Sequence, residues 1–166
     1  MGTSHHSSTR RGLSLTELLV AVVTLGMAVV ALWNAFTAEA KLVEFARQRT
    51  LASNDTIRVL EQLRWQNKGA GCVAPTIAPP APPFTAAAFA SWDAWLADSA
   101  TGGGGKSLQA IPGTNEAVVV VSTGADPLQV TIAACWTHQG RAIGDCNPVG
   151  GISSPAMFTT SMTCRP

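Results

Sequence analysis

One apolar stretch constrains this chain more than any other feature. Leu13 to Phe36 are twenty-four residues with a single charged side chain, Glu17. A helix rising about 1.5 Å per residue makes this stretch about 36 Å long, enough to cross a bilayer core of about 30 Å. A core helix of a soluble protein would need a polar face, which residues 18–33 lack. The sequence therefore predicts a membrane segment.

A secretory signal peptide is the main alternative. Arg10 and Arg11 precede the apolar run, and Ala38-Glu39-Ala40 has the small residues of a cleavage site. The run is longer than a typical signal core of about 7–15 residues, and the helical pattern continues to about Gln66. Cleavage near Ala40 would belong to an exported or membrane-tethered periplasmic binding module or enzyme.

Glu17 needs a partner, because a carboxylate inside a membrane helix costs roughly 2.5–3.5 kcal/mol. Cleavage between Gly12 and Leu13 would create an α-amino group four residues before Glu17, on the same helix face. That cation would neutralise the carboxylate, either within one chain or between neighbouring chains.

The residues from Gly12 to Leu19, GLSLTELL, resemble the prepilin processing motif of type IV pilins and type II secretion pseudopilins. The resemblance implies that a prepilin peptidase removes the leader 1–12 and methylates the new amine of Leu13. It implies that Glu17 pairs with the N-terminus of an adjacent subunit during filament assembly. It also implies a single-pass protein of the bacterial inner membrane, with its head in the periplasm until it joins a pilus or pseudopilus.

The chain departs from the family pattern at three positions. Leu13 stands where phenylalanine is commonest, Thr16 where a bulky aliphatic residue is usual, and Asn34 where many major pilins have a proline. We interpret this modest fit as that of a minor subunit. The four cysteines and long loops favour a type IV pilus over a type II secretion system. The implied partners are the peptidase/methyltransferase, other pilin or pseudopilin subunits and the inner membrane.

Residues 37–68 are expected to form the exposed half of the helix. An apolar stripe is predicted at Leu42, Phe45, Ala46, Ala52, Val59, Leu60 and Leu63. Three oppositely charged pairs at a spacing of three, Glu44/Arg47, Asp55/Arg58 and Glu61/Arg64, are expected to be exposed and the arginines solvated. The pattern allows a kink near Ser53, and Gly69 is the expected stop.

Residues 69–166 are predicted to be a small head, which gives the chain an α+β fold. A proline-rich loop follows Cys72, and a short helix from Phe84 to about Asp98 is expected to bury its tryptophans in the core. Strands are predicted at 117–122, 128–136 and 157–164, so that three or four antiparallel strands pack against the long helix.

The segment Ala100–Ser107, ATGGGGKS, satisfies a relaxed phosphate-loop pattern. A phosphate loop needs a strand before it and a helix after it, and neither is expected here. We interpret the segment as a flexible linker.

Four cysteines, Cys72, Cys135, Cys146 and Cys164, predict two disulfides in an exported domain, and spacing alone does not select among three pairings. The resemblance to pilins, many of which have a C-terminal disulfide loop, implies Cys146 with Cys164, leaving Cys72 with Cys135. No C-x-x-C occurs and His138 is the only histidine near the cysteines, so no metal site is expected.

Composition argues against several function classes. The net charge is +1 without a long basic block, so no nucleic-acid partner is predicted. The head has one histidine and no clustered catalytic motif, so neither an enzyme nor a cofactor is predicted.

Overall fold

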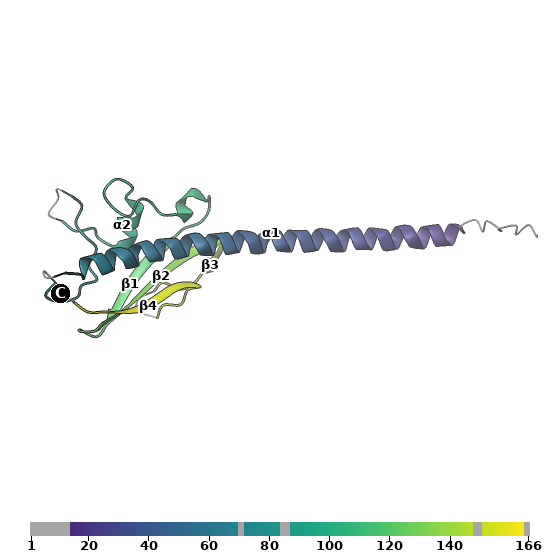
Figure 1. Cartoon of the computed structure of the whole chain (residues 1–166). Coiled ribbons are helices and arrows are strands. Elements are labelled where there is room, and N and C mark those ends of the chain that lie inside the picture. Colours follow the sequence, from purple (N-terminus) through teal and green to yellow (C-terminus); the bar gives the residue numbers. More distant parts are fainter. Residues whose placement is uncertain (1–13, 70–71, 84–86, 148–150, 165–166) are drawn as a thin grey trace, which may run out of the picture. The chain divides into compact units, whose positions relative to one another are not determined.

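A computed structural model describes residues 14–69, 72–83, 87–147 and 151–164 (Figure 1). The helix α1 (Leu15–Gln66) is followed by α2 (Trp92–Ala97), a short 3-10 helix η1 (Leu108–Ala110) and four strands. The chain divides into two units, Met1–Val43 and Glu44–Pro166, and α1 belongs to both. The predicted α+β fold is confirmed.

The strands form one antiparallel sheet centred on β2 (Leu128–His138). β1 (Ala117–Thr123) and β4 (Ala156–Met162) both pair with β2, with Val120 opposite Ile132 and Thr131 opposite Thr159. β3 (Arg141–Ile143) pairs with the C-terminal end of β2. It was not predicted, since its residues looked like part of a long loop. The two-residue turn Gln139-Gly140, with both φ angles positive, returns the chain as a hairpin.

The core of the second unit lies between α1, α2 and one face of the sheet. Its buried apolar side chains come from α1 (Ala52, Val59, Leu60, Leu63), α2 (Trp92, Trp95, Leu96), η1 (Leu108) and the strands (Val118, Leu128, Val130, Ile132, Ala134, Trp136, Ala156, Met162). Every one of these residues follows Glu44, so this unit has a hydrophobic core of its own.

The sequence allowed a kink near Ser53 in one long helix, and α1 runs without interruption from Leu15 to Gln66. The polar residues that suggested it are instead used inside the head: Asp55 and Thr56 are fully buried. The predicted apolar stripe is correct from Ala52 onward, but Leu42 and Ala46 are exposed. Asn67 ends the helix, and its side chain bonds the main chain of Thr76 through both its oxygen and its nitrogen.

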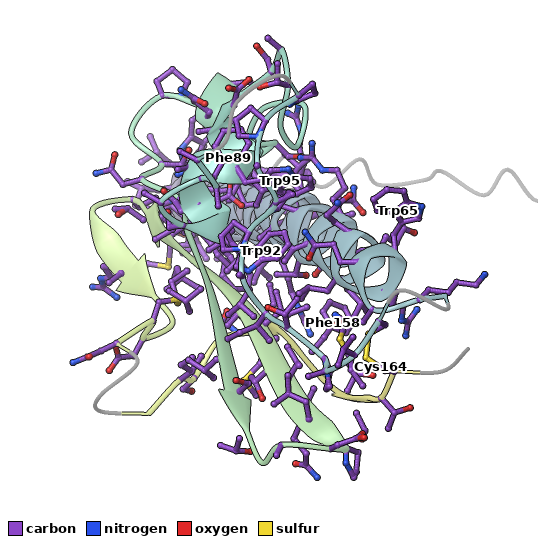
Figure 2. All side chains as sticks on the ribbon, turned by 90° about the vertical axis from the view of Figure 1, so that its left-hand side faces the viewer. Trp65, Phe89, Trp92, Trp95, Phe158 and Cys164 are labelled. Atoms are coloured by element: carbon purple, nitrogen blue, oxygen red, sulfur yellow. A yellow bond between two sulfur atoms is a disulfide. The ribbon has the colours of Figure 1, made fainter. Side chains whose placement is uncertain are left out.

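The second helix is shorter than predicted. Ser91 caps α2, its hydroxyl accepting a hydrogen bond from the Ala94 N–H, and its own extended backbone prevents the helix from starting earlier. Trp92 and Trp95 meet edge to face and are nearly fully buried, which confirms their predicted core role (Figure 2). The part of the predicted helix at residues 84–86 lies outside the described residues.

Candidate functional site: an apolar helix that starts at a glutamate

The N-terminal turn of α1 is closed by a reciprocal pair of hydrogen bonds. The hydroxyl of Ser14 accepts from the N–H of Glu17 at 3.3 Å, and the N–H of Ser14 donates to the Glu17 carboxylate at 3.4 Å. This is a capping box, in which a serine and a glutamate three residues later satisfy two otherwise free helix donors. The sequence signal, Ser-x-x-Glu before an apolar run, was present at 14–17 and was missed.

The capping box gives Glu17 a local role that does not involve another chain. A carboxylate in the first turn also interacts favourably with the helix dipole. The cap fixes the carboxylate next to the backbone of Ser14, immediately after the predicted cleavage point. Gly12 and Leu13, the predicted processing residues, lie outside the described residues.

From Leu18 to Phe36, α1 has large apolar side chains around its whole circumference. The large apolar side chains from Leu18 to Phe36 are each 47–71% exposed. By length and composition, α1 is the one described helix able to cross a membrane. A helix without a polar face needs lipid or other apolar helices around it.

The threonine hydroxyl groups in and just after this stretch bond to their own helix. Thr24 donates its hydroxyl to the carbonyl oxygens of Val20 and Ala21, and Thr37 donates to that of Asn34. Such back-bonding leaves no free hydroxyl donor in an apolar environment. Trp33 and Phe36, both well exposed, end the apolar stretch, where aromatic residues suit a membrane–water interface.

The second unit contains a charged network centred on Arg58. Its guanidinium forms an ion pair with Asp55, which is fully buried. The two terminal nitrogens of Arg58 donate to the carbonyl oxygens of Gly103 and Gly105 at 2.6 and 2.9 Å. Ser107 completes the network, because its N–H and hydroxyl both donate to Asp55, at 2.7 and 2.6 Å.

This network corrects two predictions. The pair Asp55/Arg58 was expected to be exposed, but Asp55 is fully buried and Arg58 only partly exposed. The other two predicted charge pairs form no ion pair in the part of α1 that the structure describes. The glycine-rich segment at residues 100–107 is packed and hydrogen-bonded, so the prediction that it is a flexible linker is wrong. Two of its carbonyl oxygens, those of Gly103 and Gly105, accept hydrogen bonds from the Arg58 guanidinium. The N–H of Gly103 donates to the carbonyl oxygen of Trp95. A phosphate loop would present N–H groups to an anion instead.

Glycine is required at position 103, because the segment lies against α2. A Cβ there would approach the Cα of Leu96 to 2.9 Å. Asp98 shapes the turn by accepting from the N–H groups of Ala100 and Thr101. These bonds, that of Thr101 first, lower the pKa of the exposed Asp98 carboxyl.

A second polar cluster joins Glu116, Lys106 and Asp93. Lys106 forms an ion pair with Asp93 at 2.6 Å and donates to the Glu116 carbonyl at 2.8 Å. One oxygen of the Glu116 carboxyl accepts from the Leu108 N–H at 3.2 Å, while the other is buried without a partner among the described residues. Burial raises the pKa of Glu116, although the Leu108 N–H and the charge of Lys106 oppose this. The cluster borders an open pocket of about 230 Å³.

A third network, also missed, joins α1 to the end of β2. The side-chain oxygen of Gln48, which is 2% exposed, accepts from the indole N–H of Trp136 at 3.1 Å and lies 2.8 Å from Nδ1 of His138. Phe45 packs on both rings. His138 thus has a structural contact, and the described residues hold no cluster of three or more metal-binding side chains.

The four cysteines form two disulfides, as predicted, but the pairing differs from the one that the resemblance implied. Cys72 pairs with Cys164, and Cys135 with Cys146. The sulfur of Cys146 lies 3.8 Å from the carbonyl oxygen of Ala117, the first residue of β1. Because Ala117 is opposite Cys135 on β2, Cys146 is close to Cys135 and not to the end of the chain. Cys164 follows β4 and reaches the loop after α1.

Comparison with protein-family models, curated proteins and solved structures finds no match to this chain.

Proposed function

We propose that this chain is a structural subunit, a minor pilin or pseudopilin, of a bacterial type IV pilus-like filament. The observation that carries the proposal is Glu17 at the first turn of a helix that is then apolar on all sides to Phe36. A filament core made of such helices would cover their apolar surface. A neighbour's N-terminal amine would neutralise the one carboxylate, as the resemblance at Gly12–Leu19 implies.

In this proposal the leader 1–12 is removed after Gly12 and the amine of Leu13 is methylated by a prepilin peptidase/methyltransferase. The apolar half of α1 first anchors the chain in the inner membrane, with the head in the periplasm. Two disulfides support this location, because such bonds persist in oxidising compartments. The subunit then enters a pilus, or a pseudopilus of type II secretion.

The alternative is an exported protein cleaved near Ala40. The continuity of α1 argues against this alternative. The helix passes through Ala38–Ala40 without interruption and continues to Gln66, and its last turns contribute side chains to the core of the head. The intact mass of the membrane-expressed protein separates the two proposals. Loss of residues 1–12 with one added methyl group supports the filament subunit, and cleavage after Ala40 or no cleavage contradicts it.

The capping box makes a sharper test of Glu17 possible. Glutamine also closes a capping box, so Glu17→Gln keeps the helix cap and removes only the charge. Ser14→Ala weakens the cap, by about 1 kcal/mol, and keeps the charge. We expect Glu17→Gln to abolish incorporation into filaments and Ser14→Ala to retain it. The reverse pattern would show that Glu17 serves the helix end and not assembly.

A further inference from the structure

Trp65, on the last turn of α1, is exposed although the turn belongs to the head. Its side chain is 74% exposed, whereas the other tryptophans of the second unit, Trp92, Trp95 and Trp136, are at most 7% exposed. Figure 2 shows Trp65 projecting from the end of α1 away from Trp92 and Trp95. Tryptophan is among the residues that most often anchor a binding surface, so its exposure at a helix end indicates a contact site.

Two cations, Arg64 and Lys68, lie beside this indole. Both are exposed, and neither forms an ion pair with any residue that the structure describes, including Glu61 one turn earlier. Like charges four positions apart on a helix are neighbours, an arrangement that is unfavourable without an anion between them. The helix dipole favours cations at this end but does not account for the exposed indole. Together the three side chains fit an anionic ligand with a flat apolar face.

Two hollows open at this turn. The first, of about 380 Å³, is lined by Trp65, Gln66, Lys68 and Cys72. The second, of about 390 Å³, is lined by Arg64, Asn67, Ser161, Met162 and Thr163. Among these lining residues each hollow has one charge, and in both it is positive. Because Arg64 and Lys68 are one helical turn apart, the hollows are neighbours, and a linear ligand with repeated negative charges would occupy both.

The surroundings of Trp65 favour a sugar over a protein. The centre of a protein interface contains several apolar side chains, whereas the other exposed side chains on the last two turns of α1 are charged or polar. A pyranose ring needs only one indole, because its axial C–H bonds form a flat apolar face that stacks on the aromatic ring. A carboxylate on such a ring would be within reach of the neighbouring cations.

We propose that the end of α1 binds an acidic polysaccharide of a cell surface, a chain of pyranose units that carry carboxylates. One sugar ring stacks on Trp65, its carboxylate pairs with Lys68, and the next acidic unit pairs with Arg64. The two disulfides support an exported head, which would meet such polysaccharides. The site lies entirely in the unit Glu44–Pro166 and does not rest on the filament proposal, so the two proposals fail separately.

The first experiment titrates the detergent-solubilised full chain with a hexamer of galacturonic acid in a calorimeter. The methyl ester of the same hexamer keeps the rings and linkages but has no charge, so it is the matched control ligand. We expect the acid to bind at least about tenfold more tightly than the ester, and its affinity to fall as salt is raised. Equal affinity for the two, or no binding of the acid, overturns the proposal.

The second experiment changes the site, using the same hexamer. Trp65→Ala is expected to weaken binding at least about tenfold, and Trp65→Phe, which keeps an aromatic face, to retain most of it. Lys68→Gln and Arg64→Gln should each weaken binding about threefold. Arg47→Gln, an exposed arginine of α1 outside both hollows, is the matched control and should leave the affinity unchanged. Wild-type affinity in Trp65→Ala, or equal effects of Arg64→Gln and Arg47→Gln, contradicts the proposal.

A nucleic acid is another ligand with flat rings and negative charges. Proteins bind single strands through a series of aromatic and basic side chains, whereas this turn has one indole. A thymidine hexamer, titrated in the same way, is therefore expected to bind at least about tenfold more weakly than the galacturonic acid hexamer. Equal or tighter binding of the oligonucleotide that is lost in Trp65→Ala would overturn the assignment to a polysaccharide.

Discussion

The carboxylate of Asp55, in the C-terminal part of α1, accepts a hydrogen bond from the main-chain N–H of Ser107 at 2.7 Å, across 52 positions of the sequence. The same carboxylate forms the ion pair with Arg58, whose guanidinium holds the glycine-rich segment through two carbonyl oxygens. One buried acidic residue therefore joins the long helix to a segment without regular secondary structure.

Removing the Asp55 carboxylate should destabilise the head strongly. Breaking a buried ion pair typically costs 3–5 kcal/mol, and because Arg58 is 31% exposed we expect Asp55→Ala to lie at the low end, about 3 kcal/mol. Urea unfolding followed by tryptophan fluorescence measures the loss. Glu61→Ala is the control: it is also on α1, three residues before an arginine, and should change stability by less than about 0.5 kcal/mol. Equal effects of the two variants would contradict the network.

The carboxyl of Glu116 should make stability depend on pH. When unfolded it ionises near its ordinary pKa of 4.5, whereas burial raises the pKa in the folded head. The folded state then binds more protons, so stability falls as pH rises from below 4.5 through the raised pKa. Glu116→Gln is expected to remove this pH dependence, so that the free energy of unfolding of the variant increases relative to that of the wild type as pH rises. Urea unfolding from pH 4 upward measures the difference between the two curves, which would stay constant if Glu116 were ordinary.

The two disulfides should differ in their contribution to stability. Cys72–Cys164 spans 92 residues and Cys135–Cys146 spans 11. In the chain-entropy description, loops of these lengths correspond to about 4.5 and about 3 kcal/mol. Replacing both cysteines of one pair by alanine, in separate proteins, tests the order by urea unfolding. A larger loss from the short loop would mean that native packing around Cys135 outweighs the loop term.

A methyl group at position 103 should not fit. Because the added Cβ would come within 2.9 Å of the Leu96 backbone, Gly103→Ala is expected to cost about 1–3 kcal/mol of head stability. Gly26→Ala is the control, since a Cβ at Gly26 meets no atom within 4 Å and should leave unfolding of the head unchanged. An unchanged midpoint for Gly103→Ala would mean that the segment moves freely away from α2.

The elements of this fold that the sequence predicted well are those with a strong local pattern. The apolar run before Phe36 and the β-branched run at Val118–Val121 need no distant information, and both appear as expected. The capping box at Ser14 and Glu17 has an equally local signal, Ser-x-x-Glu before an apolar run, which was not predicted.

Three of the errors, at Asp55, at the glycine-rich segment and in the cysteine pairing, involve residues whose role depends on a distant partner. Asp55 looked like a surface or cap residue because nothing near it in sequence shows that Ser107 will reach it. The glycines at 102–105 looked flexible for the same reason, as their packing against Trp95 and Arg58 is a tertiary effect. The cysteine pairing likewise depended on β3 and β4 being in place, and spacing carries no such information.

The disulfide between Cys72 and Cys164 encloses both helices of the loop region and all four strands, so it has a consequence for the order of folding. The head cannot be completed until β4, the last strand to be synthesised, has reached the same compartment as the end of α1. Contacts this far apart in sequence also form slowly. Throughout that interval the apolar half of α1 already exists and must be sheltered from water. A membrane that receives it first would keep the unfinished head attached, in place and out of reach of aggregation.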